Sequence, residues 1–96
     1  MKITINAVHF DATEKLEKFI NQKLEKMDRR HEEISEAIVT LKVVKPESAN
    51  NKEAGIKLLG AKGGDAFANK VANTFEEAVD VAIDALQRQL DKYEDK

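Results

Sequence analysis

The hydrophobic residues of this chain switch between the spacing of a strand and the spacing of a helix, and the order of the switches restricts the fold. Residues 1–6 alternate apolar and polar side chains, which is the period of a half-buried strand. Residues 14–30 place apolar side chains three and four positions apart, as on one face of a helix. The β-branched residues of 34–45 alternate again. The first half of the chain is therefore predicted to form a strand, a helix and a second strand.

The next segments predict two further strands. The turn residues of 46–51 separate the second strand from a third, at 53–62, and we expect the two strands to pair as a hairpin. Residues 63–65, Gly-Gly-Asp, are typical of a tight turn. The alternating run 66–72 after this turn predicts a fourth, short strand.

A last helix is expected from about residue 74. Thr74 and Glu77 have the spacing of a capping box, and the apolar residues after them keep helical spacing almost to the end of the chain. The predicted order is β-α-β-β-β-α. Its economical packing is an α+β fold with a mostly antiparallel four-stranded sheet and both helices on one face. We expect one domain over residues 1–96.

The composition excludes several kinds of chemistry. The chain has no cysteine, which removes disulfides, thiolate metal sites and cysteine nucleophiles and suits a reducing cytosol. The first residues contain no apolar core of signal-peptide length, and no stretch approaches the ~20 apolar residues that a membrane span requires. We therefore expect a cytoplasmic protein that has no membrane partner.

No group of residues has the spacing of a catalytic or metal-binding site. His9 and His31 are not spaced as a ligand pair. The glycine-rich run 60–64 matches neither the P-loop nor the dinucleotide fingerprint, and a hairpin turn explains it better. Acidic residues near the start of the last helix suit its dipole and a solvated face: Glu76, Glu77, Asp80 and Asp84. We expect no enzymatic activity, metal, cofactor or small-molecule substrate.

The charges of the first helix are sorted by sign around its axis. One flank of the apolar stripe is basic and the other acidic, with Lys15, Lys18, Lys23, Lys26, Arg29 and Arg30 opposite Glu14, Glu17, Glu25 and Asp28. Dipole effects and i,i+4 pairs explain part of this pattern, but not six basic residues on one flank. On the last helix, Arg88, Lys92 and Lys96 form a ridge on the same rotational flank.

A basic ridge can hold a polyanion even though the chain has a net charge of −2. Charges within about a Debye length, ~8 Å at physiological salt, outweigh distant charges. Contacts to phosphates need lysine and arginine but no base readout. With no Trp and one Tyr, the sequence favours recognition of RNA shape and backbone over stacking on single strands.

The chain resembles the ribosome hibernation promoting factor family, also called sigma-54 modulation proteins. The resemblance runs nearly end to end and rests on MKITINA, TEKLEKFINQKLEKM, TLKVVK and VANTFEEAVDVAIDALQRQLDKYEDK. It implies a β-α-β-β-β-α domain, topologically close to double-stranded-RNA-binding domains. It also implies a translation inhibitor that binds the small ribosomal subunit in the channel for messenger and transfer RNA and keeps idle ribosomes inactive.

The resemblance also implies contacts to ribosomal RNA, carried over position by position. These are Lys23 and Lys26 on the first helix, Lys42 and Lys45 on the second strand, and Arg88 and Lys92 on the last helix. Arg29 and Arg30 join them from charge geometry alone. The implied partners are the small subunit and its ribosomal RNA, extending to the 70S ribosome or ribosome dimers. The chain looks like a short form, and its sequence leaves open whether it promotes dimers or silences single ribosomes.

An alternative function uses the same scaffold differently. The chain would then be a protein-interaction module, for example one that modulates transcription, with the acidic flank of a helix as its working surface.

Overall fold

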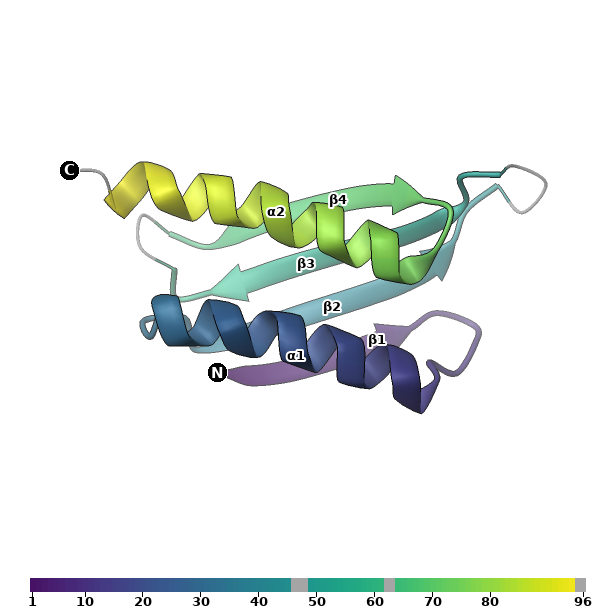
Figure 1. Cartoon of the computed structure of the whole chain (residues 1–96), viewed down its shortest axis with the longest axis horizontal. Coiled ribbons are helices and arrows are strands. Elements are labelled where there is room, and N and C mark those ends of the chain that lie inside the picture. Colours follow the sequence, from purple (N-terminus) through teal and green to yellow (C-terminus); the bar gives the residue numbers. More distant parts are fainter. Residues whose placement is uncertain (46–48, 62–63, 95–96) are drawn as a thin grey trace.

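The six predicted elements are present in their predicted order in a computed structural model of the chain (Figure 1). The structure describes residues 1–45, 49–61 and 64–94, of which residues 93 and 94 are described by their backbone alone. They are β1 (Lys2–Ala7), α1 (Glu14–Arg30), β2 (Glu36–Val43), β3 (Lys52–Leu59), β4 (Ala66–Ala72) and α2 (Phe75–Glu94). The prediction for 66–72 matches β4 residue for residue, whereas the predicted strand 34–45 is longer than β2 at both ends.

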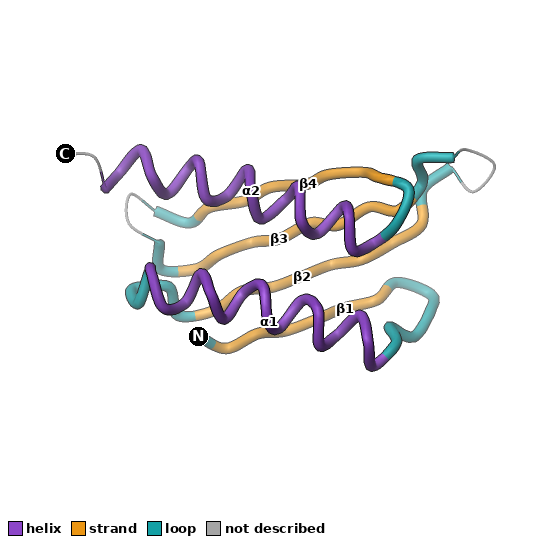
Figure 2. Tube along the Cα trace, viewed as in Figure 1, coloured by secondary structure: helices purple, strands orange, loops and turns teal. Residues whose placement is uncertain are grey.

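The four strands form one mixed sheet in the order β1-β2-β3-β4 (Figure 2). β1 and β2 pair in parallel, while β2 with β3 and β3 with β4 pair antiparallel, which confirms the hairpin and the mostly antiparallel sheet. The parallel pair follows from the length of α1. Its 17 residues span about 26 Å at 1.5 Å per residue. The helix therefore returns the chain to the end of the sheet where β1 began.

Threonine side chains begin both helices. The Thr13 hydroxyl accepts a hydrogen bond from the Leu16 amide at 3.1 Å, and Thr13 is the N-cap of α1. The Thr74 hydroxyl accepts one from the Glu77 amide, also at 3.1 Å, as the capping-box pattern predicted. Each helix thus has a fixed starting residue, and its apolar stripe has a fixed rotation.

Both helices cover the same face of the sheet and enclose the core (Figure 1). α1 contributes the buried side chains Leu16, Ile20, Leu24 and Met27. β2 and β3 contribute larger apolar residues, whereas β4 presents alanines, which leave room for α2 to pack close to the strand: Ala66, Ala68 and Ala72. Phe10 stacks on Phe75 with ring centroids 5.0 Å apart and joins the β1–α1 loop to the start of α2.

Two of the described glycines in the connection between β3 and β4 lie in the left-handed region. Gly60 has φ +84° and Gly64 has φ +111°, conformations that glycine adopts without the steric cost of a Cβ. The Gly64 amide donates to the Ala61 carbonyl at 3.0 Å. Part of the predicted turn at 63–65 lies outside the described residues, as does part of the turn at 46–51.

The two glycines give a matched pair for testing the packing of this connection. A Cβ on Gly60 would lie 2.9 Å from the Glu33 carbonyl oxygen, whereas a Cβ on Gly64 would meet nothing within 4 Å. We expect Gly64→Ala to lower the free energy of unfolding by about 1–2 kcal/mol through backbone strain alone. Gly60→Ala should cost about 2–4 kcal/mol, because strain and overpacking add. Urea denaturation measures both, and equal losses would contradict the clash with Glu33.

Candidate nucleic-acid interface

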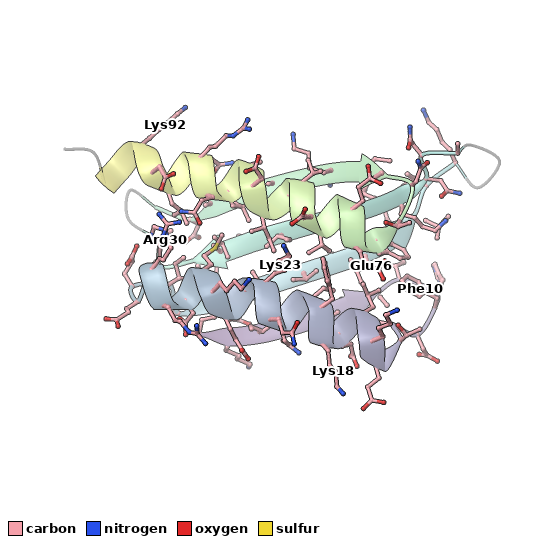
Figure 3. The ribbon with its side chains drawn as sticks, viewed as in Figure 1. Phe10, Lys18, Lys23, Arg30, Glu76 and Lys92 are labelled. Atoms are coloured by element: carbon pink, nitrogen blue, oxygen red, sulfur yellow. The ribbon has the colours of Figure 1, made fainter. Side chains whose placement is uncertain are left out.

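The two helices lie side by side and run in the same direction (Figures 1 and 3). Contacts between them advance together along both chains: Lys23 meets Asp80, and Arg30 meets Asp91 seven residues later on α1. When two neighbouring helices run parallel, side chains on the same rotational flank of each point in the same direction in space. The flank of α1 that faces α2 therefore corresponds to the flank of α2 that points away from α1.

This arrangement accounts for part of the charge sorting on α1. Part of its basic flank faces an acidic flank of α2, with Lys23 Nζ 2.9 Å from Asp80 Oδ1 and Arg30 Nη2 3.8 Å from Asp91 Oδ1. Lys23 also lies over the Phe19 ring, with its Nζ 5.6 Å from the ring centroid. Two of the predicted RNA contacts are thus already paired with carboxylates of the neighbouring helix.

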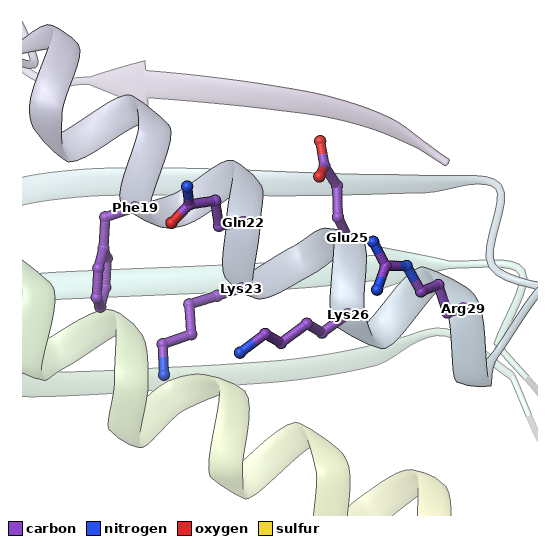
Figure 4. A pocket seen from close by; sticks show the side chains of 6 residues that line it. All are labelled: Phe19, Gln22, Lys23, Glu25, Lys26 and Arg29. Carbon is purple, nitrogen blue, oxygen red and sulfur yellow. The ribbon is translucent and has the colours of Figure 1, made fainter.

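Lys26 and Arg29 differ from Lys23 because they are exposed and form no ion pair within the described part of the chain. They line a shallow hollow of about 260 Å³ on α1, together with Phe19, Gln22, Lys23 and Glu25. Figure 4 shows Lys23 and Lys26 extending from α1 toward the neighbouring helix. Lys26 and Arg29 are therefore more available to an external anion than Lys23.

A polar cluster closes the interface where α1 ends, beside Gln87 and Asp91 of α2. His31 is buried directly after α1, and its Nε2 lies 3.2 Å from the side-chain nitrogen of Gln87. The same Gln87 nitrogen donates to Asp91 Oδ1 at 3.1 Å. On the other side of the ring, His31 Nδ1 lies 3.7 Å from Glu33 Oε2. His31 is thus a buried structural residue, and His9 lies far from it, exposed in the turn after β1 with φ +63°.

The predicted contacts on α2 lie on its other flank. Lys92 points away from α1 in Figure 3, and Arg88 precedes it by one helical turn. Arg88 Nη2 forms an i,i+4 ion pair with Asp84 Oδ2 at 3.1 Å. The basic ridge of α2 is therefore separated from the basic flank of α1 by the width of α2. Lys96, the third residue of the predicted ridge, lies outside the described residues.

The last two predicted contacts belong to β2 and to the residues after it. Lys42 projects from the sheet face that the helices leave uncovered, with its Nζ 3.8 Å from Glu53 Oε1 on β3. Lys45 is exposed beyond the end of β2, with φ +47°. The eight predicted residues thus occupy three places: the α1 surface, the outer flank of α2, and the open sheet with its adjoining loop.

Phe67 was not among the predicted site residues, yet its side chain is 55% exposed on the open face of the sheet. The signal was present in the alternation of 66–72, where alanines mark the packed face and leave Phe67 on the other. The preference for recognition of RNA shape over base stacking rested on the lack of Trp and the single Tyr, and it did not take Phe67 into account.

The described residues contain no group of three or more histidine, cysteine, aspartate or glutamate side chains placed to hold a metal ion. Neither helix, over its described length, is long and apolar enough to cross a bilayer. The features that the structure does show are an α+β scaffold, ion pairs between the helices and exposed cations.

The chain belongs to the Sigma 54 modulation protein / S30EA ribosomal protein family, whose sequence model matches residues 3–96. It is 30% identical over 96 residues to the ribosome hibernation promoting factor of Escherichia coli K12, covering 100% of this chain and 96% of the relative. The factor of the same name from Pseudomonas putida KT2440 is 28% identical, with 100% and 89% covered. These relatives are named for ribosome hibernation and not for an enzymatic reaction.

Solved structures show the same fold. The N-terminal domain of Thermus thermophilus Protein Y superposes with a TM-score of 0.79 at 21% identity, covering 97% of this chain and 99% of that one. A ribosomal subunit interface protein from Coxiella burnetii superposes with a TM-score of 0.74 at 24% identity, covering both chains fully.

The pairing of Lys23 with Asp80 can be measured by a double-mutant cycle. We expect Lys23→Gln and Asp80→Asn to couple by about 0.2–1 kcal/mol in urea unfolding at low salt, as partly exposed ion pairs do. The coupling should shrink as salt is added. Lys18, which points away from α2 in Figure 3, provides the control. The cycle of Lys18→Gln with Asp80→Asn should be additive within about 0.5 kcal/mol, and equal coupling in both cycles would contradict a specific pair.

Proposed function

We propose that the protein is a ribosome hibernation factor that binds the small ribosomal subunit in the channel for messenger and transfer RNA and keeps idle ribosomes inactive. The observation that carries this proposal is the family relationship, which extends over residues 3–96 and includes a relative of that name at 30% identity. The protein would act as one domain in the cytoplasm, where ribosomes are found.

The mechanism that the surface supports is occlusion. A rigid domain that fills an RNA-lined channel excludes messenger and transfer RNA without breaking or forming a covalent bond. Its affinity would come from lysine and arginine side chains that neutralise phosphates and release counterions. Phosphate contacts fix position and need no sequence readout.

The structure divides the proposed contacts into two groups. Lys26, Arg29, Lys45 and Lys92 are exposed and have no ion pair among the described residues. The other four have carboxylate partners: Lys23 with Asp80, Arg30 with Asp91, Lys42 with Glu53 and Arg88 with Asp84. An exposed ion pair contributes only about 0–1 kcal/mol. Phosphates can therefore replace these carboxylates at small cost, and the paired cations form a second group of contacts.

The alternative of a protein-interaction module has less support from the geometry. Its working surface would be an acidic helix flank. On α2, Asp80 and Asp91 already face Lys23 and Arg30, so this surface would have to be the acidic flank of α1, where Glu14, Glu17 and Glu25 are exposed. Retention of a protein partner from nuclease-treated lysate, without ribosomal RNA or ribosomal proteins, would favour this alternative.

Charge reversal of Lys26 tests the proposed interface. Lys26 and Lys18 lie on the same helix, and both are exposed, but only Lys26 extends toward α2 (Figures 3 and 4). In sucrose gradients with ribosomes depleted of messenger and transfer RNA, we expect Lys26→Glu to weaken co-sedimentation by about tenfold or more. The same reversal at Lys18 should have a much smaller effect.

The salt dependence separates a lost phosphate contact from a general change in charge. The slope of log affinity against log salt is negative, and each lost phosphate contact should bring it closer to zero by about 0.7–0.9. The slope should therefore become less steep for Lys26→Glu and stay the same for Lys18→Glu. Equal losses of binding and equal slopes in the two variants would remove Lys26 from the interface.

Removal of an acidic partner should have the opposite effect. In Asp80→Asn, Lys23 loses its carboxylate partner and becomes available to a phosphate. We expect ribosome association to strengthen by about two- to fivefold, corresponding to an exposed ion pair of at most ~1 kcal/mol. Glu77→Gln is the matched control, since Glu77 lies on the same helix without an ion pair among the described residues. An equal gain in both variants would indicate net charge alone.

A further inference from the structure

The second face of the sheet has no covering element in the described part of the chain, because both helices lie on the first (Figure 1). The strand register places outward-facing residues in rows across β2, β3 and β4. One row is Ile38, Lys57 and Phe67, and the next is Thr40, Gly55 and Asn69. This open face thus brings an aromatic ring, a lysine and two uncharged polar side chains together.

These two rows border a shallow hollow of about 290 Å³. Gly55 lies in the middle of β3, where the lack of a side chain lowers the surface of the sheet. A Cβ on Gly55 would lie 3.7 Å from Cε1 and Cζ of Phe67, so the ring borders the space above the glycine. The hollow therefore has one flat apolar wall, which Phe67 provides.

The position of Phe67 is fixed although β4 is an edge strand. The side-chain nitrogen of Gln89 on α2 donates to the Phe67 carbonyl oxygen at 3.0 Å. The antiparallel pairing with β3 holds the other side of the strand. The exposed ring is thus presented from a backbone that is anchored on both sides, which lowers the ordering cost of binding.

The charges around the hollow favour an anionic ligand. Lys42 and Lys57 line it, against a single carboxylate, that of Glu53. The Glu53 side chain is only 22% exposed and faces Lys42 at 3.8 Å. Lys57 lies directly opposite Phe67 in the register. A second copy of this chain would bring the same lysines against one another, which disfavours self-association through this face.

We propose that this open face binds a nucleotide of single-stranded RNA. The base stacks on Phe67 above Gly55, because every base has a π-face that an exposed aromatic ring can accept. Asn69 and Thr40 offer hydrogen-bond donors and acceptors to the edge of the base. Lys57 and Lys42 pair with the adjoining phosphates. The site lies on the opposite face from α1, so its existence does not depend on how the helices contact the ribosome.

The test uses the fact that the chain has no tryptophan. Phe67→Trp places a single fluorescent indole in the site. Short oligouridylate and oligoadenylate strands are titrated at low salt, with a blunt RNA duplex as the comparison. We expect the single strands to quench the indole saturably, because stacking on a base perturbs its fluorescence. The duplex, whose bases are already stacked, should leave the fluorescence nearly unchanged.

Variants with labelled oligouridylate then separate stacking from other binding. We expect Phe67→Ala and Phe67→Leu to weaken binding in fluorescence anisotropy by about 5- to 100-fold, since Leu keeps the apolar contact but loses the ring. Val71→Ala is the matched control, because Val71 is exposed on the same strand but does not line the hollow. It should bind like the parent chain. Addition of Lys26→Glu to the Phe67→Trp variant should leave the quenching of the indole intact.

Three results would overturn the proposal. The first is oligouridylate binding that is unchanged in Phe67→Ala, which would assign all binding to the helical cations. The second is equal quenching of the indole by the duplex and the single strands. The third is an indole signal that changes with protein concentration in the absence of RNA, which would indicate that a second copy covers this face. Each result can occur whether or not the protein binds ribosomes.

Discussion

Burial of two apolar helix stripes on one face of the sheet determines which way the charged flanks of both helices point. The stripe of α1, from Leu16 to Met27, and the stripe of α2, from Ala78 to Leu90, must both meet the sheet. The threonine caps and these stripes fix the rotation of each helix about its axis. Once this rotation is set, the direction in which each charged flank points is set as well. The same constraint leaves the second face of the sheet uncovered by any described element.

Because the two helices run parallel, some of the basic side chains of α1 pair with carboxylates of α2. Part of the basic flank of α1 lies against the acidic flank of α2, where Lys23 and Arg30 meet carboxylates. Each such pair contributes little to stability, so the pairs neutralise surface charge but can be broken at small cost in free energy. A net charge of −2 is thus compatible with a domain that presents local positive charge at Lys26 and Arg29.

The two faces suit different modes of RNA recognition. The helical face offers cations on a rigid surface, which suits phosphates held in a fixed shape. The open sheet offers an exposed ring beside Lys57, which suits an unpaired base. A domain with both would contact structured and single-stranded RNA from opposite sides. Such an arrangement fits a proposed position inside a channel that is lined by RNA on more than one side.

The sequence by itself determined the elements, their order and the inward face of each one, because period and capping are local properties of the chain. It also determined the family, and it singled out the basic residues of α1. Only the tertiary structure decided that β1 and β2 pair in parallel and that Lys23 faces Asp80. It also separated Arg88 and Lys92 from the cations of α1 and left Phe67 uncovered. The physical reason is that periodicity places a side chain relative to its own axis, whereas its neighbours depend on how the elements pack.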